Sequence, residues 1–222
     1  QRGLKKAIDN GKVTTAQLDE AVRRVLRLKY MLGLFDDPFK YLDPQRRAAT
    51  LEKAEFRQTA REAAAKSMVL LKNDGGLLPL NPSGPFRKIA IIGPLADSRS
   101  YKDYMSFWTL GIGVRDYDST KVVTPAMALK PALEALGFEV TVVQSDLSAA
   151  SDEAAYSASI EAAKGADLII ACVGERGLDC GENRSLTDIN LPRGQERFLR
   201  IATSNGVKPT VMVLFNSRPL TF

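Results

Sequence analysis

The first third of the chain shows a helical spacing of apolar residues. Over residues 14–32, apolar side chains recur every three or four positions, which predicts an amphipathic helix. Thr14 and Gln17 form a capping-box pattern at its start, and Gly33 is a typical stop. A second apolar stripe predicts another helix from about residue 51 to 73, which two consecutive glycines then break.

From residue 86 onward, short apolar runs alternate with helical stretches. The runs that predict β-strands are 88–93, 138–144, 166–174 and 209–216. The stretches that predict helices are 124–137, 151–164 and 192–205. Because each run is almost continuously apolar, we expect parallel strands that are covered on both faces, with the helices as crossovers. The predicted fold class is α/β, a three-layer α/β/α sandwich with a mainly parallel open sheet.

The amino-acid composition excludes several classes of binding and catalytic site. The 222 residues carry a net charge of +5, but the basic residues are scattered and form no face of the kind that binds nucleic acid. No stretch approaches the roughly 18 apolar residues of a membrane helix. Histidine is absent, which excludes Ser-His-Asp and Cys-His catalysis and most zinc sites. Carboxylates are therefore the best candidates for chemistry, and we expect no metal, cofactor, nucleic acid or membrane as a partner.

The connection after the first predicted strand is long enough to suggest a function. Functional residues of open parallel sheets gather beyond the carboxyl ends of the strands, and this connection runs from Gly93 to Thr124. It lacks the G-x-G-x-x-G pattern, so no nicotinamide or flavin is expected. It holds several aromatic residues, including Trp108, the only tryptophan. These aromatics could form a small core or stack against a sugar ring.

The connection after the third predicted strand is rich in charge. Residues 175–188 include four carboxylates and two arginines, a composition that fits either a solvated loop or a catalytic one. Gly177 and Gly181 allow the backbone to approach a ligand. A carboxyl group in a partly dry cleft has a raised pKa, so it can stay protonated and donate its proton to a leaving group.

The last predicted strand ends close to the end of the chain. After it, Arg218 could pair with a carboxylate of the neighbouring loop or have a helix-capping or purely structural role. A strand of this kind with nothing beyond it suggests that the chain is a fragment of a larger protein.

Six segments, in this order along the chain, resemble one known family. They are 23–38 (RRVLRLKYMLGLFDDP), 60–80 (AREAAAKSMVLLKNDGGLLPL), 88–98 (KIAIIGPLADS), 166–175 (ADLIIACVGE), 185–195 (SLTDINLPRGQ) and 216–220 (NSRPL). Together they resemble glycoside hydrolase family 3, particularly bacterial β-glucosidases of the periplasmic or secreted type. The family usually has glycine where this chain has Ser217.

The resemblance implies a domain organisation. Family members pair a (β/α)8-type barrel with an α/β/α sandwich, and the active site lies between the two. Residues 1–43 are then the C-terminal helices of the barrel with a linker, 44–84 the linker and first helix of the second domain, and 85–222 a truncated sandwich. The nucleophile of the family is a barrel aspartate, which lies outside this chain.

The resemblance also implies site residues. Glu182 best matches the acid/base glutamate of the family. Trp108 is similar in placement to a tryptophan that contacts the leaving-group sugar, and Glu175 and Arg184 are expected to support substrate binding.

The implied activity is that of a retaining, exo-acting β-glucosidase, which hydrolyses terminal β-D-glucosyl residues by double displacement. The partners would be a β-glucoside or oligosaccharide and the missing N-terminal barrel, and the location periplasmic or secreted. The fragment alone is expected to be inactive. Two alternatives stay open: a β-xylosidase or α-arabinofuranosidase of the same family, and a non-catalytic sugar-binding or structural α/β module.

Overall fold

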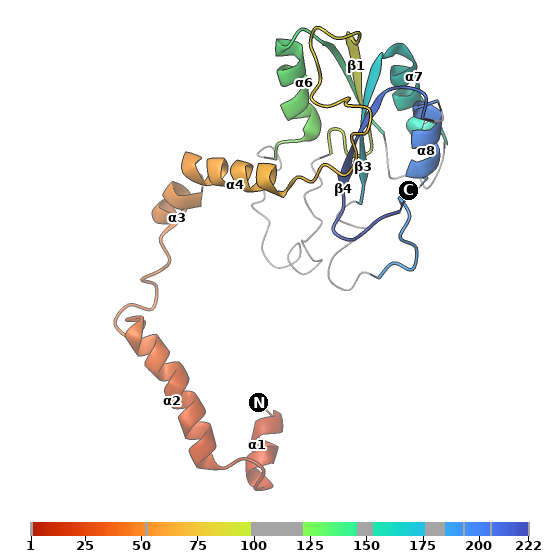
Figure 1. The fold of residues 1–222 in the computed structure, drawn as a ribbon. Helices are drawn as coiled ribbons and strands as arrows, with labels where there is room; N and C mark the ends of the chain where they lie inside the picture. Colours follow the sequence, from red (N-terminus) through yellow and green to blue (C-terminus); the bar gives the residue numbers. More distant parts are fainter. Residues whose placement is uncertain are drawn as a thin grey trace. The chain divides into compact units, whose positions relative to one another are not determined.

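The computed structural model describes residues 2–51, 53–98, 122–145, 153–175, 185–192, 194–204 and 206–221 (Figure 1). The chain divides into two compact units, residues 1–71 and residues 72–222. The first unit is helical, and the second contains the sheet.

The first unit consists of α1 (Arg2–Asp9), α2 (Thr15–Met31), α3 (Pro44–Leu51) and α4 (Ala54–Ser67). The predicted capping box of α2 is confirmed: Thr14 Oγ1 accepts from the Gln17 amide at 3.2 Å, and the Gln17 side chain accepts from the Thr14 amide at 2.9 Å. The helix α1 was not predicted.

The predicted helix over 51–73 is wrong in its bounds. Its residues form the end of α3 and the shorter α4, which ends at Ser67. The Ser67 hydroxyl donates to the Ala64 carbonyl at 2.8 Å and so satisfies one of the free carbonyls at the end of the helix. Met68 then takes an extended conformation, with ψ at 133°.

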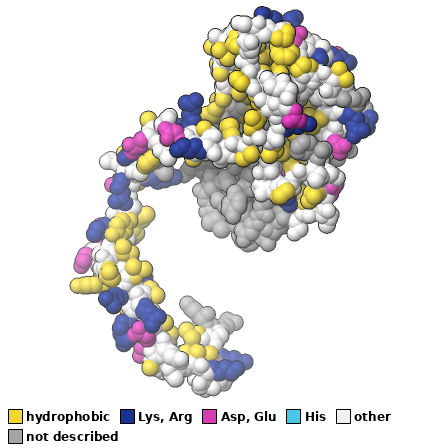
Figure 2. Space-filling model, in the orientation of Figure 1, with side chains coloured by type: hydrophobic (Ala, Val, Ile, Leu, Met, Phe, Trp, Pro, Cys, Tyr) yellow, Lys and Arg dark blue, Asp and Glu magenta, His cyan; other side chains and the backbone are white. Residues whose placement is uncertain are grey.

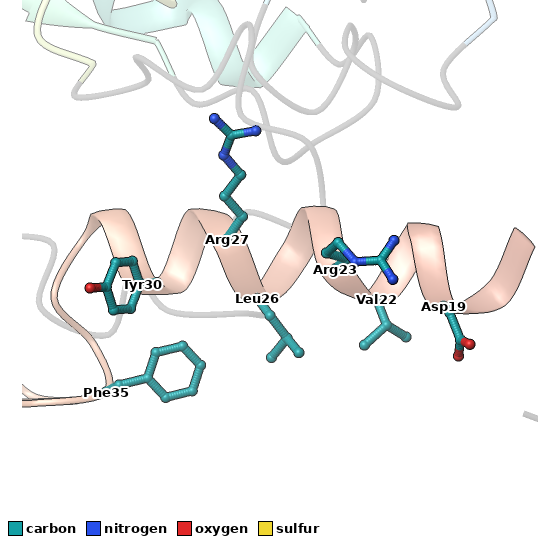
Figure 3. Close-up of a pocket in the computed structure, with 7 residues that line it drawn as sticks. All are labelled: Asp19, Val22, Arg23, Leu26, Arg27, Tyr30 and Phe35. Atoms are coloured by element: carbon teal, nitrogen blue, oxygen red, sulfur yellow. The ribbon is translucent and has the colours of Figure 1, made fainter. Parts of the chain in front are cut away.

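Much of the apolar surface of the first unit is exposed. Neither α2 nor α4 contains a buried residue. An open pocket on α2 is lined in part by Val22, Leu26, Tyr30 and Phe35, and Arg27 points away from Leu26 (Figure 3). Hydrophobic side chains are also visible along this unit in Figure 2. An exposed apolar surface of this kind indicates an interaction surface.

The second unit is a parallel sheet between helices, as predicted. Its elements are β1 (Lys88–Gly93), α6 (Pro125–Ala135), β2 (Glu139–Gln144), η4 (Glu153–Tyr156), α7 (Ser157–Gly165), β3 (Leu168–Gly174), α8 (Gln195–Ala202) and β4 (Thr210–Phe215). The four strands of the described residues are parallel in the order β2-β1-β3-β4. Pro192 was expected to begin the last helix, but α8 begins at Gln195, because Gly194 has a left-handed φ of 71°.

Two cores cover the faces of the sheet. Ala90 and Ile92 pack on one face with residues of α7 and α8, whereas Ile89 and Ile91 pack on the other with α6. Figure 1 shows α6 on one side of the strands and α7 with α8 on the other. This alternation along β1 makes the three layers of the predicted sandwich. No described helix has the length and apolar character needed to span a membrane.

Cys172 lies in the second of these cores, within the apolar strand β3. Burial raises the pKa of its thiol to about 12, so the thiol stays protonated at neutral pH. This cysteine is therefore a structural residue.

The strand order places a topological switch between β1 and β3. The chain leaves β1 toward β2 on one side and returns to β3 on the other. At such a point, connections on opposite faces separate beyond the carboxyl ends of the strands and leave room for a ligand. Both strands end in glycine, Gly93 and Gly174.

Both glycines are required by close backbone contacts. Gly93 and Gly174 have φ of +109° and +132°. A Cβ on Gly174 would lie 1.9 Å from the Phe215 carbonyl oxygen, and one on Gly93 would lie 2.5 Å from that of Cys172. Only glycine fits this combination of conformation and contact.

We therefore predict that Gly174→Ala is far more destabilising than Gly137→Ala. Gly137 also has a positive φ, of +89°, but an added Cβ would meet nothing within 4 Å. Backbone strain alone costs about 1–2 kcal/mol, and the clash should add about 1–3 kcal/mol for Gly174. Thermal and urea unfolding of both variants measures the difference. Equal losses of stability would contradict the role of the Phe215 contact.

Candidate functional site

The candidate site lies at the carboxyl edge of the sheet, where the two connections singled out by the sequence leave β1 and β3. Of the predicted site residues, Glu175 is described, and Glu182, Trp108 and Arg184 lie outside the described residues. The described residues at the beginning and end of those two connections define the geometry of this edge.

Glu175 directly follows β3 and is buried, with an exposed fraction of 1%. Its Oε2 accepts from the Ser217 amide at 3.0 Å and from the Ser217 hydroxyl at 3.2 Å. Arg218 Nε lies 2.6 Å from the other oxygen, Oε1. Within the described residues, that oxygen accepts no hydrogen bond, so its contact with Arg218 is an ion pair. Of the two roles considered for Arg218, pairing with a carboxylate is the one observed.

This ion pair is a strong constraint because its acid is fully enclosed. The Glu175 side chain is 0% exposed, and the Arg218 side chain 24%. A carboxylate loses several kcal/mol of hydration when it is buried, and only a well-placed cation and hydrogen-bond donors compensate for that loss. The pair also connects the end of β3 to the residues after β4.

The backbone beside Glu175 is held from both sides. On one side, the Glu175 amide donates to the Phe215 carbonyl of β4 at 2.9 Å. On the other side, the Gln195 side chain accepts from the Gly174 amide and donates to the Gly174 carbonyl, each at 2.8 Å. Gln195 is 0% exposed.

The far end of the acidic connection is held by the residues after β4. Asn190 and Thr221 form an isolated parallel bridge, and the Thr221 hydroxyl donates to the Asn190 side chain at 2.5 Å. The Thr221 amide also donates to the Ile189 carbonyl at 2.8 Å. The segment 216–221 therefore contacts the chain both before and after the connection that contains Glu182.

The connection after β1 begins and ends at one place. The Thr124 hydroxyl donates to Asp97 at 2.6 Å and accepts from the Met127 amide at 3.1 Å, which makes Thr124 the N-cap of α6. The Ala126 amide also donates to the Ala96 carbonyl at 2.8 Å. The two ends of the connection that contains Trp108 thus lie side by side at the carboxyl edge.

The described residues contain no group of three or more His, Cys, Asp or Glu side chains that could hold a metal ion. The edge contains a buried carboxylate paired with a cation, backbone held by hydrogen bonds at two strand ends, and anchored ends for two connections. Such an arrangement can hold further polar side chains in position for proton transfer.

The sequence did not predict the roles of two of these residues. Asp97 and Gln195 belong to the segments 88–98 and 185–195 that carry the family resemblance, with no role assigned to either. A signal for Gln195 does exist: it is an uncharged polar residue in the first turn of a helix whose other inward positions, such as Phe198, are apolar. A polar side chain on a buried face needs a partner, which here is backbone.

Comparison with known proteins identifies relatives over nearly the whole chain. Residues 68–222 match the family model for the glycosyl hydrolase family 3 C-terminal domain. A periplasmic β-glucosidase of Salmonella typhimurium is 36% identical over 96% of this chain, and a β-xylosidase of Formosa agariphila is 33% identical over 98%. The crystal structure of a β-glucosidase from Listeria innocua in complex with isofagomine has a TM-score of 0.76, with 34% identity and 98% of this chain covered.

The chain spans only part of these relatives. It covers 29% of the Salmonella and Formosa proteins and 28% of the Listeria chain. The described sandwich and the helices before it therefore correspond to one section of considerably longer proteins.

The burial of Glu175 predicts a large effect of Arg218→Met. The substitution leaves a fully enclosed carboxylate without its cation, and the expected loss of stability is about 2–5 kcal/mol. The double variant Glu175→Gln/Arg218→Met should recover part of that loss, because the uncompensated charge is gone. Thermal and urea unfolding measure both.

The exposed pair of Arg200 and Glu196 provides the control for this experiment. Its N–O distance is 2.8 Å, but its side chains are 63% and 50% exposed. Arg200→Met should therefore cost less than about 1 kcal/mol. Similar losses for Arg218→Met and Arg200→Met would refute the importance of burial.

Proposed function

This chain belongs to glycosyl hydrolase family 3, and from that premise we propose that it is the acid/base-carrying part of a retaining β-glucosidase. The proposed reaction is the removal of terminal β-D-glucosyl residues from a β-glucoside or oligosaccharide. The proposed proton donor is Glu182, with Trp108 and Arg184 on the sugar and Glu175 in a supporting role.

The observation that carries this proposal is that the acidic connection begins at a residue held firmly in place, Glu175. Glu182 follows Glu175 by seven residues. Glu175 itself is held by Ser217, Arg218 and Phe215 at the carboxyl edge of the sheet. Acid/base catalysis requires a carboxyl group that stays within hydrogen-bond reach of the leaving oxygen, so a rigid starting point favours this function over that of a plain solvated loop.

The proposed mechanism is double displacement. A carboxylate on the missing domain attacks the anomeric carbon, and the C–O bond to the leaving group breaks as the Glu182 carboxyl group gives its proton to the departing oxygen. Glu182, now a carboxylate, then takes a proton from water, and that water displaces the enzyme carboxylate. Retaining enzymes of this kind hold their two carboxyl groups about 5–5.5 Å apart. Glu182 therefore acts only with the other domain in place.

The exposed apolar surface of the first unit supports a covering domain. Many large apolar residues in the second half of α2 and in the segment between α2 and α3 are well exposed, among them Leu28, Tyr30, Met31, Phe35, Phe39 and Leu42. We propose that residues 1–43 are the last helices of a (β/α)8-type barrel, 44–84 a linker with the first helix of the second domain, and 85–222 the sandwich. In this arrangement the rest of the barrel buries that surface.

A β-xylosidase or an α-arabinofuranosidase is the second candidate within the family. It is favoured by the similarity to the Formosa protein, which is named a β-xylosidase. These activities differ in how the sugar subsites, which the barrel is proposed to form, accommodate the C6 group of the sugar. A panel of aryl glycosides on the full-length protein separates them. A periplasmic or secreted location, proposed from the Salmonella protein, is tested by fractionating cells of the source organism.

We predict that Glu182→Gln in the full-length protein has an effect that depends on the leaving group. For a glycoside with a poor leaving group, such as an alkyl glycoside, kcat/KM should fall by about 10²- to 10⁴-fold, the usual contribution of general acid catalysis. For a dinitrophenyl glycoside, whose leaving group needs no proton, kcat/KM should fall far less. The two kcat/KM values are measured for wild type and variant.

Asp179→Asn is the matched control, since Asp179 lies in the same connection. It should leave the ratio of the two kcat/KM values unchanged. If Asp179→Asn alters that ratio and Glu182→Gln does not, the proton donor is misassigned. If neither does and sugar binding persists, the non-catalytic binding module is the better description.

The purified 222-residue chain should not hydrolyse an aryl β-glucoside, since the proposed nucleophile is not part of it. Steady-state assays at high protein concentration, beside the full-length protein, measure this. Circular dichroism establishes that the short chain is folded in the assay. Clear turnover by the short chain alone would overturn the proposed division of the two carboxylates between domains.

A further inference from the structure

Gln195 makes two hydrogen bonds that fix the backbone from which the acidic connection starts. Its Oε1 accepts from the Gly174 amide and its Nε2 donates to the Gly174 carbonyl, both at 2.8 Å. An amide side chain that pairs with both backbone groups of one residue imitates a neighbouring β-strand. It leaves that residue little freedom to move.

The sheet itself explains why such a mimic is needed. β3 pairs with β1 only as far as Ile92 and Ala171, and Gly174 lies three residues further along. The chain after β1 turns away, with the Leu95 amide bonded to the Cys172 carbonyl. The two polar groups of Gly174 on that side would be buried without a partner, at a cost of about 1–3 kcal/mol each.

The position of Gly174 gives this contact its significance. On the β4 side, the Glu175 amide is bonded to the Phe215 carbonyl, so the dipeptide is held along both edges. Gly174 has a φ of +132° and no side chain, which makes this the point where the backbone could most easily rotate. Rotation at Gly174 would disturb Glu175 and so change the direction in which the connection that contains Glu182 leaves β3.

We propose that Gln195 is a positioning residue for acid/base catalysis, an inference that rests on the proposed function. It acts through Gly174 and Glu175 on the orientation of the connection that carries Glu182, without touching the substrate. A misplacement of a reacting group by about 1 Å can lower a rate by about 10²-fold. The loss of this contact should therefore reduce proton transfer selectively.

The test is Gln195→Met in the full-length protein, which keeps the length of the side chain and removes both hydrogen bonds. For a glycoside with a poor leaving group, kcat/KM should fall by about 10- to 100-fold. For the dinitrophenyl glycoside of the same sugar it should fall by less than about threefold, because that first step needs no proton donor. A purely structural role would lower both values together.

Lys208→Met is the matched control. Lys208 Nζ donates to the Ala163 and Lys164 carbonyls at 2.6 and 3.0 Å, near the opposite edge of the sheet where β4 begins. This variant loses two side-chain-to-backbone bonds in the same unit but should leave the ratio of the two kcat/KM values unchanged. Thermal melts establish that each variant is folded at the assay temperature.

Gln195→Asn provides a second variant if Gln195→Met does not fold. It keeps a neutral amide but is one methylene shorter, so it cannot pair with both the Gly174 amide and the Gly174 carbonyl as Gln195 does, and the same selective loss is expected. Equal losses on both substrates, or no loss, in the folded variant would overturn the inference while Glu182→Gln still reports on the proposed function. If Glu182→Gln itself shows no dependence on the leaving group, the proposed function and this inference both fall.

Discussion

The ion pair between Glu175 and Arg218 is the interaction on which the carboxyl edge of the sheet depends. Glu175 cannot be buried at the end of β3 unless a cation and hydrogen-bond donors meet it, and Ser217 and Arg218, which follow β4, supply them among the described residues. The requirement fixes the end of β3 against the segment 216–221. Because Thr221 of that segment also binds Ile189 and Asn190, one short stretch of chain determines where the acidic connection begins and where it ends.

The two units of the chain differ in how far they bury their apolar residues. In the second unit, the faces of the sheet are filled by α6 on one side and by α7 and α8 on the other, so its residues bury one another. In the first unit, α2 and α4 bury no residue, although both carry apolar side chains. Helices with this pattern gain most of their stability from packing against a partner. The first unit is thus expected to depend on the rest of the protein for its stability more than the sandwich does.

Periodicity and composition were enough to predict the sandwich, the parallel sheet and the cap at Thr14, because these follow from local patterns of a few residues. Helix bounds were less predictable: the apolar run after Ser67 continues the helical stripe, yet the backbone there is extended. The role of Gln195 depends on where β1 stops pairing with β3, which is a property of tertiary structure. Pairing of Arg218 with a carboxylate was one of two open alternatives, since spacing alone cannot decide between partners far apart in the chain. Glu182, Trp108 and Arg184 remain predictions.

The anchoring of both ends of the connection after β1 has a consequence for the evolution of such a protein. Asp97 and Thr124 hold the two ends together irrespective of what lies between them. The entropy cost of closing a loop grows only with the logarithm of its length, so residues could be gained or lost there at little expense to the sheet. Insertions and deletions could then accumulate in this stretch, while the strands that carry it stay as they are.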